Sequence, residues 1–335
     1  MFRIEALIII LLSCAFLFWG GGCATVPPYA YIPNLIYYKS DDYIVYQLRT
    51  DDSPELLAER FLGDPRKDWL IEEANPGMVI EPGRFVVIPI KPRNPGGITS
   101  EGIQIVPILC YHRFGSHCGS SLCVPEDIFE QQMRFLKTNG YKTISPQELL
   151  GYLEYKHPLP KKSVMITVDD GYRSFYTVAY PILKKYGFTA TMFVYTNFVE
   201  VSSKAITWDQ LRELKANGFS IGSHSIAHSD LSKQGENESH DAYKSRLWYE
   251  IFNSKKIIDD QLDQDTLFFA YPFGRASQEA MTMVQQAGYQ LAVTVNRGGN
   301  AFFSQRYLLY RDQVIKWDLA SFQARLNTFY SIRLR

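Results

Sequence analysis

The stretch Ser163-Val164-Met165-Ile166-Thr167-Val168-Asp169-Asp170-Gly171 decides how this chain is interpreted. Five apolar or β-branched residues lead to two adjacent carboxylates, and a glycine then ends the pattern. Such a run predicts a buried strand. Because side chains alternate along a strand, Asp169 and Asp170 are expected to point in different directions. Two like charges at the end of an apolar strand are unfavourable unless a cation neutralises one of them.

A second polar stretch, His224-Ser225-Ile226-Ala227-His228, places two imidazoles four residues apart, just beyond a predicted strand that ends at Gly222. Parallel α/β folds build their sites where strands end. One carboxylate and two imidazoles form a candidate shell for a divalent metal, with zinc as the expected ion, because zinc accepts mixed oxygen and nitrogen ligands. Polar surface histidines are the alternative explanation of this spacing.

The surrounding pattern alternates strands with helices. Strands are predicted at 106–111, 164–168, 189–195, 219–222, 267–270 and 289–295, and helices at 126–139, 146–155, 172–186, 208–217, 240–262 and 277–287. This alternation predicts an α/β fold with a parallel sheet, either open or closed into a barrel.

The chain of 335 residues is long enough for one large domain and a smaller one. Equal numbers of basic and acidic residues, 35 of each, argue against a nucleic-acid partner. The predicted segments are a signal peptide at 1–22, a tether at 23–42, a small domain at 43–90, a linker at 91–102 and a large domain at 103–335.

The sequence of the N-terminus is typical of a targeting segment. An apolar run at 7–19 is followed by three glycines and Cys23, which resembles a bacterial lipoprotein signal with Cys23 as the lipidated residue. An uncleaved membrane helix is the alternative. Either reading predicts an extracytoplasmic protein anchored to a membrane, in the periplasm or at the cell surface. In that setting Cys118 and Cys123 are candidates for a disulfide, whereas Cys110 lies in an apolar strand.

The small domain has a strand–helix–helix–strand pattern that resembles a LysM module. The resemblance lies in Tyr43-Ile44-Val45, the helix from Ser53 to Phe61, Asn75, and the segment from Ile80 to Pro89. It implies binding of chains that contain N-acetylglucosamine. Thr50-Asp51-Asp52-Ser53 replaces the Gly-Asp-Thr-Leu stretch of that family, and a packing domain without a ligand is the alternative.

The large domain resembles the polysaccharide deacetylases, the NodB-type carbohydrate esterases. Thr167–Gly171 is similar to their T-F-D-D-G motif, His224–His228 to their H-S/T-x-x-H motif, and Phe268–Gly274 to their third motif. Ile108–Phe114 is similar to the first strand of the exopolysaccharide-deacetylating branch. The resemblance implies a distorted (β/α) barrel.

The resemblance also implies roles for individual residues. Asp170, His224 and His228 match the metal ligands, and Asp169 matches the general base. His112 matches the proposed acid of the exopolysaccharide branch, and this chain has no histidine after His240 that could supply the usual late acid. The third motif offers Tyr271, through its backbone N–H, and Phe273 as substrate-binding residues.

Two departures from the family pattern affect the surroundings of the base. Ala270 replaces the arginine of the third motif, and the Asp-x-x-Asp-Trp motif is missing. Arg311 is a candidate substrate contact that could also supply the missing charge; an ordinary surface arginine is the alternative.

These features predict a membrane-anchored, metal-dependent enzyme that removes N-acetyl groups from a polysaccharide containing N-acetylglucosamine. The substrate stays open: the LysM-like module points to peptidoglycan, and the Tyr111–Phe114 stretch points to a secreted exopolysaccharide. Three other functions remain open: an esterase for O-acetyl groups, a glycan-binding protein that has lost catalysis, and a metal-binding surface protein.

Overall fold

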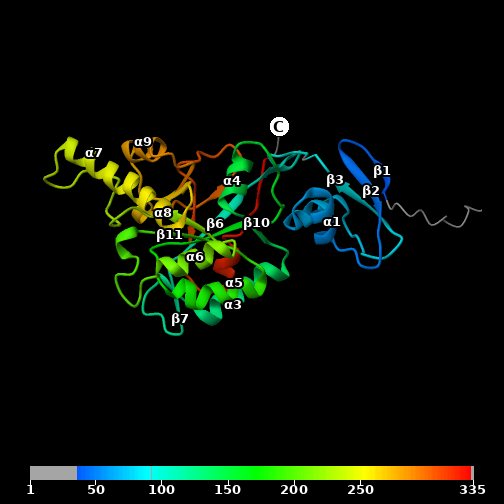
Figure 1. The fold of residues 1–335 in the computed structure, drawn as a ribbon, viewed down its shortest axis with the longest axis horizontal. Helices are drawn as coiled ribbons and strands as arrows, with labels where there is room; N and C mark the ends of the chain where they lie inside the picture. Colours follow the sequence, from blue (N-terminus) through cyan, green and yellow to red (C-terminus); the bar gives the residue numbers. More distant parts are fainter. Residues whose placement is uncertain (1–35, 92, 333–335) are drawn as a thin grey trace, which may run out of the picture.

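The computed structural model describes residues 36–91 and 93–332. The predicted signal segment, Cys23 and most of the predicted tether lie outside these residues. Figure 1 shows a small N-terminal domain beside a large α/β domain. No helix in the described ranges is long and apolar enough to cross a membrane.

The small domain is a three-stranded antiparallel sheet covered by helices, with strand order β1-β2-β3. Its elements are β1 (Ile36–Lys39), β2 (Tyr43–Gln47), α1 (Pro54–Leu62), the 3-10 helix η1 (Pro65–Lys67), α2 (Asp68–Ala74) and β3 (Phe85–Pro89). The Ser53 side chain caps α1 by accepting from Leu56 N, with Pro54 at the first helical position. The tether prediction was wrong for 36–39, because these residues pair with β2.

The large domain begins within the predicted linker. β4 (Ile98–Thr99) pairs with β5 (Gly102–Gln104), which in turn pairs with β17 (Phe329–Ser331). The linker prediction was therefore wrong from residue 98 onward.

The elements of the large domain alternate as predicted. The strands of the central sheet are β6 (Val106–Tyr111), β9 (Lys142–Thr143), β10 (Ser163–Val168), β11 (Thr191–Val194), β12 (Ser220–Ser223), β13 (Phe268–Ala270), β14 (Leu291–Val293), β15 (Gly299–Asn300) and β16 (Asp312–Gln313). The helices are α3 (Glu126–Thr138), α4 (Pro146–Leu153), α5 (Tyr180–Tyr186), α6 (Trp208–Ala216), α7 (His240–Trp248), α8 (Ser254–Leu262), α9 (Gln278–Gln286) and α10 (Leu319–Gln323). Short 3-10 helices are η3 (Thr196–Phe198) and η5 (Pro272–Gly274).

Two of the predicted helices contain a π-helical turn. Such a turn, η2 (Phe175–Ala179), leads directly into α5, and another, η4 (Tyr249–Asn253), lies between α7 and α8. Turns of this kind inside helices often occur near functional sites, and η4 supplies a residue of the site described below.

The sheet runs in the order β14-β13-β12-β11-β10-β6-β15, and its neighbours from β6 to β14 are parallel. Val293 of β14 forms a parallel bridge to Leu309, and β16 pairs with β6. The segment 309–313 therefore links the two edges of the sheet, so that the sheet curls into a partly closed barrel. This arrangement brings the carboxyl ends of the parallel strands to one rim, whereas β15 runs antiparallel to β6.

Alternate residues of each strand pack on opposite faces of the sheet. In β10, Val164, Ile166 and Val168 join the cluster formed with α3, α5, α6 and α8, whereas Met165 joins the cluster that contains α4. Figure 1 shows α3, α5 and α6 on one side of β10 and α4 on the other. Both faces of β10 are buried, which explains its continuous apolar run.

A short parallel pair, β7 (Arg113–Gly115) and β8 (Cys123–Pro125), frames a loop near the rim. The predicted disulfide between Cys118 and Cys123 is present in this loop, with an S–S distance of 2.05 Å, and Cys110 is buried as predicted. The two domains touch through a salt bridge of 2.6 Å between Lys142 and Asp68.

Candidate active site

The site lies at the rim where β6, β10, β12 and β13 end. Asp169 and Asp170 directly follow β10, His224 follows β12, and His112 follows β6. A cavity of about 160 Å³ is lined by these four residues together with His228, Phe273 and others. The structure thus brings together two polar stretches that the sequence separates by more than fifty residues.

Three side chains converge on one point in this cavity. Oδ1 of Asp170 lies 3.7 Å from Nε2 of His224 and 3.5 Å from Nε2 of His228. Asp170 and His228 both have positive φ angles, 79° and 55°, a conformation that is uncommon outside glycine and that occurs often at functional sites. Ligands about 2.0–2.2 Å from a tetrahedral zinc ion lie roughly 3.3–3.6 Å apart. The 3.5 Å distance falls in this range and the 3.7 Å distance lies just above it, so a small movement of the side chains would accommodate the ion.

The protonation state of the imidazoles also fits a metal shell. Nδ1 of His224 lies 2.7 Å from the carbonyl oxygen of Ala270, so Nδ1 carries the proton and Nε2 keeps a free lone pair. Burial lowers the pKa of His224 to about 4 and also lowers that of His228, which keeps both rings neutral at pH 7. Neutral imidazoles and a carboxylate are the donor set that zinc prefers.

Burial raises the pKa of Asp170 to about 6, and the neighbouring Asp169 adds to this effect against the opposing influence of His112 and Arg113. A cation beside Asp170 would reverse the shift by favouring the ionised form. The residues present therefore fit a divalent metal held by Asp170, His224 and His228.

Asp169, unlike Asp170, forms a buried ion pair with Arg311. The guanidinium contacts both carboxylate oxygens, at 2.7 Å and 2.8 Å, and also donates to the carbonyl oxygen of Thr294. Burial alone would raise the pKa of Asp169, but the charge of Arg311 outweighs it and holds this pKa well below its usual range. Asp169 is therefore ionised at neutral pH.

The substrate-contact prediction for Arg311 was wrong, and so was the surface alternative. Its side chain is fully buried, so it reaches the substrate only through Asp169. The structure instead supports the interpretation that Arg311 supplies the charge missing at Ala270.

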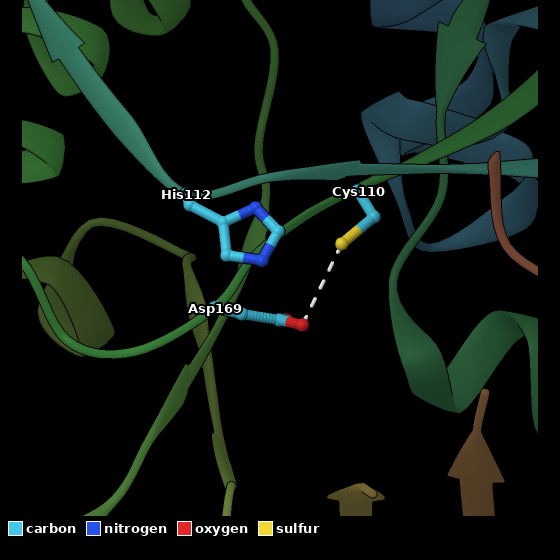
Figure 2. Close-up of side chains that lie close together, drawn as sticks. All are labelled: Cys110, His112 and Asp169. Carbon is cyan, nitrogen blue, oxygen red and sulfur yellow. Dashed lines mark hydrogen bonds between the residues drawn. The ribbon is translucent and has the colours of Figure 1, made fainter. Parts of the chain in front are cut away.

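Figure 2 shows the side chains of Cys110 and His112 directed toward Asp169. The Cys110 thiol lies 3.5 Å from Oδ2 of Asp169. Burial raises the pKa of this thiol well above its usual value, so it stays protonated and can donate to the carboxylate. His112 is half-buried and lines the cavity, and one of its ring nitrogens lies within 4.8 Å of a carboxylate oxygen of Asp169.

The third motif was predicted to contribute the Tyr271 amide, and the structure contradicts this. The Tyr271 N–H already donates to the carbonyl oxygen of Val293, and its side chain is buried in a hydrophobic cluster. Phe273 lies in the cavity wall instead: the residue is 53% exposed, and its ring centroid is 4.6 Å from that of His228. Within the described part of the chain, the Phe273 N–H has no hydrogen-bond acceptor.

Glu250, in the π-helical turn η4, was missed by the sequence analysis. One carboxylate oxygen accepts from the amides of Ile226 and Ala227, both at 2.9 Å, and the other accepts from the Ser229 hydroxyl at 2.9 Å. Glu250 is buried and fixes the loop that connects His224 to His228. A glutamate 22 residues beyond His228, in a segment predicted as an ordinary helix, carries no local signal of this contact.

Three comparisons match this architecture. Residues 156–292 match the polysaccharide deacetylase family. YxkH of Bacillus subtilis (strain 168), whose name assigns it provisionally to the polysaccharide deacetylases, is 36% identical over 217 residues, which cover 65% of this chain and 74% of that protein. The poly-beta-1,6-N-acetyl-D-glucosamine N-deacetylase of Staphylococcus aureus (strain MRSA252) is 28% identical over 211 residues, or 58% of this chain and 72% of that protein.

A solved structure shows the same fold. The deacetylase PplD of Streptococcus pyogenes, in complex with acetate, superposes with a TM-score of 0.58 at 33% identity, over 63% of this chain and 92% of that chain. The curled parallel sheet, the aspartate pair and the two histidines are thus accompanied by similarity along most of the large domain. The chain therefore belongs to the polysaccharide deacetylase family, and it is a hydrolase of the polysaccharide N-deacetylase type.

Proposed function

We propose that this protein hydrolyses N-acetyl groups of an N-acetylglucosamine-containing polysaccharide at the cell envelope. One observation carries the proposal: a metal-binding triad and an ionised, buried carboxylate face the same small cavity. The reaction would release acetate and leave a free amine on the sugar, which is cationic at neutral pH.

Asp170, His224 and His228 would hold a divalent cation, with zinc as the expected ion. When bound, the cation would act as a Lewis acid toward the acetamide carbonyl and the attacking water. The Nδ1 contact to Ala270 supports this role, because it directs Nε2 of His224 toward Asp170.

Asp169 would act as the general base. Its carboxylate is ionised and oriented by Arg311, with the Cys110 thiol on the same oxygen as one guanidinium nitrogen. A carboxylate fixed in this way can accept a proton from water without first rearranging. Arg311 would be a positioning residue, because it touches the base and not the substrate.

His112 would supply the proton that the leaving amine needs. It lines the cavity together with Asp169 and Asp170, and the other histidines that line this cavity are assigned to the cation. Phe273 lines this cavity and its amide has no acceptor in the described part of the chain, so this amide would replace that of Tyr271 as the donor to the oxyanion that forms during acyl transfer.

The small domain would bind the polymer as a LysM-like module. Support comes from its strand–helix–helix–strand order and from Asn75, whose side chain donates to Val87 O and accepts from Val87 N and thereby fixes the turn between α2 and β3. Binding of N-acetylglucosamine oligomers by a fragment and by the full chain would test this part.

We also propose an extracytoplasmic location, with Cys23 as a lipid anchor or the apolar run at 7–19 as a membrane helix. This proposal rests on the sequence of the N-terminus and on a disulfide between Cys118 and Cys123, which persists in oxidising compartments. Labelling with radioactive palmitate, compared between the natural chain and Cys23→Ala, would separate the two anchors.

The substrate assay compares acetate release from poly-N-acetylglucosamine, from peptidoglycan and from matched N- and O-acetylated oligomers. Release from the N-acetylated oligomers supports the proposal. Release from the O-acetylated oligomers alone would favour an esterase, and binding without release would favour a protein that has lost catalysis.

A further inference from the structure

A second cavity adjoins the candidate active site and is rich in basic residues. It has a volume of about 390 Å³, and Arg297, Lys316 and Arg325 contribute to its wall. Val295 and Gln313 line both this cavity and the candidate active site. We call the second cavity the basic groove. The shared walls place this groove directly beside the active-site cavity.

The topology explains why the groove lies beside the reacting centre. β16 runs parallel to β6, with Gln313 opposite Cys110. The segment after β16, which contains Lys316, therefore leaves the sheet at the same rim as His112. Arg297 reaches this place from the loop after β14, because Val293 pairs with Leu309 just before β16.

The charges in the groove do not cancel. Its acidic residue, Asp312, is buried and lies 2.8 Å from Nε of Arg297, whose side chain remains 66% exposed. In the ranges 36–91 and 93–332, Lys316 has no acidic partner within salt-bridge distance. Arg325 donates to the carbonyl oxygens of Gln313 and Ser321 and keeps its full charge.

The fourth cation near the groove, Arg311, is already neutralised by Asp169. The groove therefore carries a net positive charge of two beside the cavity in which the acetyl group would be cleaved. Clefts lined by one sign of charge attract ligands of the opposite sign, and arginine is suited to carboxylate and phosphate groups.

We propose that the basic groove binds an oxyanion substituent, a carboxylate or a phosphate, on a sugar next to the one that is deacetylated. The preferred substrate is then an anionic glycan that contains N-acetylglucosamine, and an uncharged poly-N-acetylglucosamine chain leaves the groove without a charged partner. This inference rests on the proposed N-deacetylase function and defines its substrate class more narrowly.

The test uses the full chain and four glycans of matched length. They are peptide-free glycan strands that carry a carboxylate on alternate sugars, the same strands with the carboxylates amidated, N-acetylglucosamine oligomers with phosphate monoesters, and unmodified oligomers. Acetate release gives kcat/KM for each glycan at low and high salt. The variants are Lys316→Gln, Lys316→Glu and Arg297→Gln, with Lys256→Gln on the exposed face of α8 as the matched control.

We expect the natural chain to have a higher kcat/KM for an anionic glycan than for its uncharged counterpart. The ratio of the two values should fall about three- to fivefold in Lys316→Gln and further in Lys316→Glu. High salt should reduce the same preference, and Lys256→Gln should leave it unchanged. The carboxylated and phosphorylated arms identify the oxyanion. The proposal would be overturned if Lys316→Glu kept the same preference for anionic over uncharged glycans as the natural chain. It would also be overturned if the natural chain had the same kcat/KM for the carboxylated and amidated strands and no preference for the phosphorylated over the unmodified oligomers.

Arg297→Gln leaves the buried Asp312 without its partner and can lower stability, so its melting temperature is measured alongside; Lys316 has no such structural contact. If the natural chain releases acetate from none of the four glycans, the proposed function fails. Calorimetric binding of the same glycans then tests whether the groove binds an oxyanion. Salt-sensitive binding of an anionic glycan that weakens in Lys316→Glu supports it, and equal binding of charged and uncharged glycans refutes it.

Discussion

Arg311→Gln tests the buried ion pair behind the proposed base. In the natural chain Arg311 makes two charge-assisted hydrogen bonds to Asp169 and also donates to the carbonyl oxygen of Thr294 and the hydroxyl of Thr167. Neither charged side chain is more than 3% exposed. Removing one partner leaves an uncompensated buried charge, which typically lowers stability by about 3–5 kcal/mol. For a domain of this size the melting temperature should fall by roughly 10 °C at pH 7.

The loss should depend on pH, and its sign follows from Asp169. In the natural chain Arg311 lowers the folded-state pKa of Asp169 below the value of about 3.9 expected for an unfolded chain. The pair therefore stabilises the fold above about pH 4, and this contribution disappears as the pH falls through the folded-state pKa. In Arg311→Gln the main effect that opposes burial is lost, so the pKa of Asp169 rises and the variant is destabilised as the pH rises. The difference in stability between the two proteins should shrink from pH 7 toward pH 4.

Urea unfolding of both proteins between pH 4 and pH 8 measures this difference. Arg306→Gln is the control, because Arg306 forms a half-exposed pair with Glu154 at 3.2 Å that should contribute only about 0.2–1 kcal/mol. The reasoning is refuted if Arg311→Gln loses no more stability than Arg306→Gln, or if its loss is the same at every pH.

Further predictions concern the metal loop, the disulfide and the acid. Glu250→Gln should weaken zinc affinity about 10- to 100-fold, measured by competition with a chromophoric chelator, because it removes an acceptor that fixes the loop carrying His228; unchanged affinity would reject this bracing role. Reduction of the bond between Cys118 and Cys123 should lower the unfolding free energy by about 2 kcal/mol, as expected for a loop of this length, and a chain with both cysteines replaced by serine should not respond to the reductant. His112→Asn should lower kcat about 10²-fold or more while KM changes little; a change confined to KM would make His112 a substrate contact.

The residues at the rim of the sheet could be predicted because they lie in short sequence motifs at the ends of strands. The aspartate pair ends an apolar strand and His224 follows another, so the alternation of strands and helices was enough to bring Asp170 near His224 and His228. The predicted disulfide was found for the same reason, since its cysteines flank a short polar loop.

Contacts made by residues outside these motifs could not be predicted. Arg311 reaches Asp169 across 142 residues, and this contact depends on the bridge by which the segment before β16 closes the sheet. Glu250 reaches the histidine loop only because a π-helical turn interrupts the helix there. The Tyr271 prediction was wrong by two residues: the Tyr271 amide bonds to Val293, and the residue that lines the cavity is Phe273.

The most direct test of the central claim is acetate release from an N-acetylglucosamine oligomer by the natural chain and by Asp169→Asn, each stripped of metal and then supplied with zinc. Melting curves establish that both proteins are folded. The account predicts that release by the natural chain requires the metal and that Asp169→Asn releases acetate at least about 10²-fold more slowly with zinc present. Undiminished release by folded Asp169→Asn, or by the natural chain without metal, would contradict it.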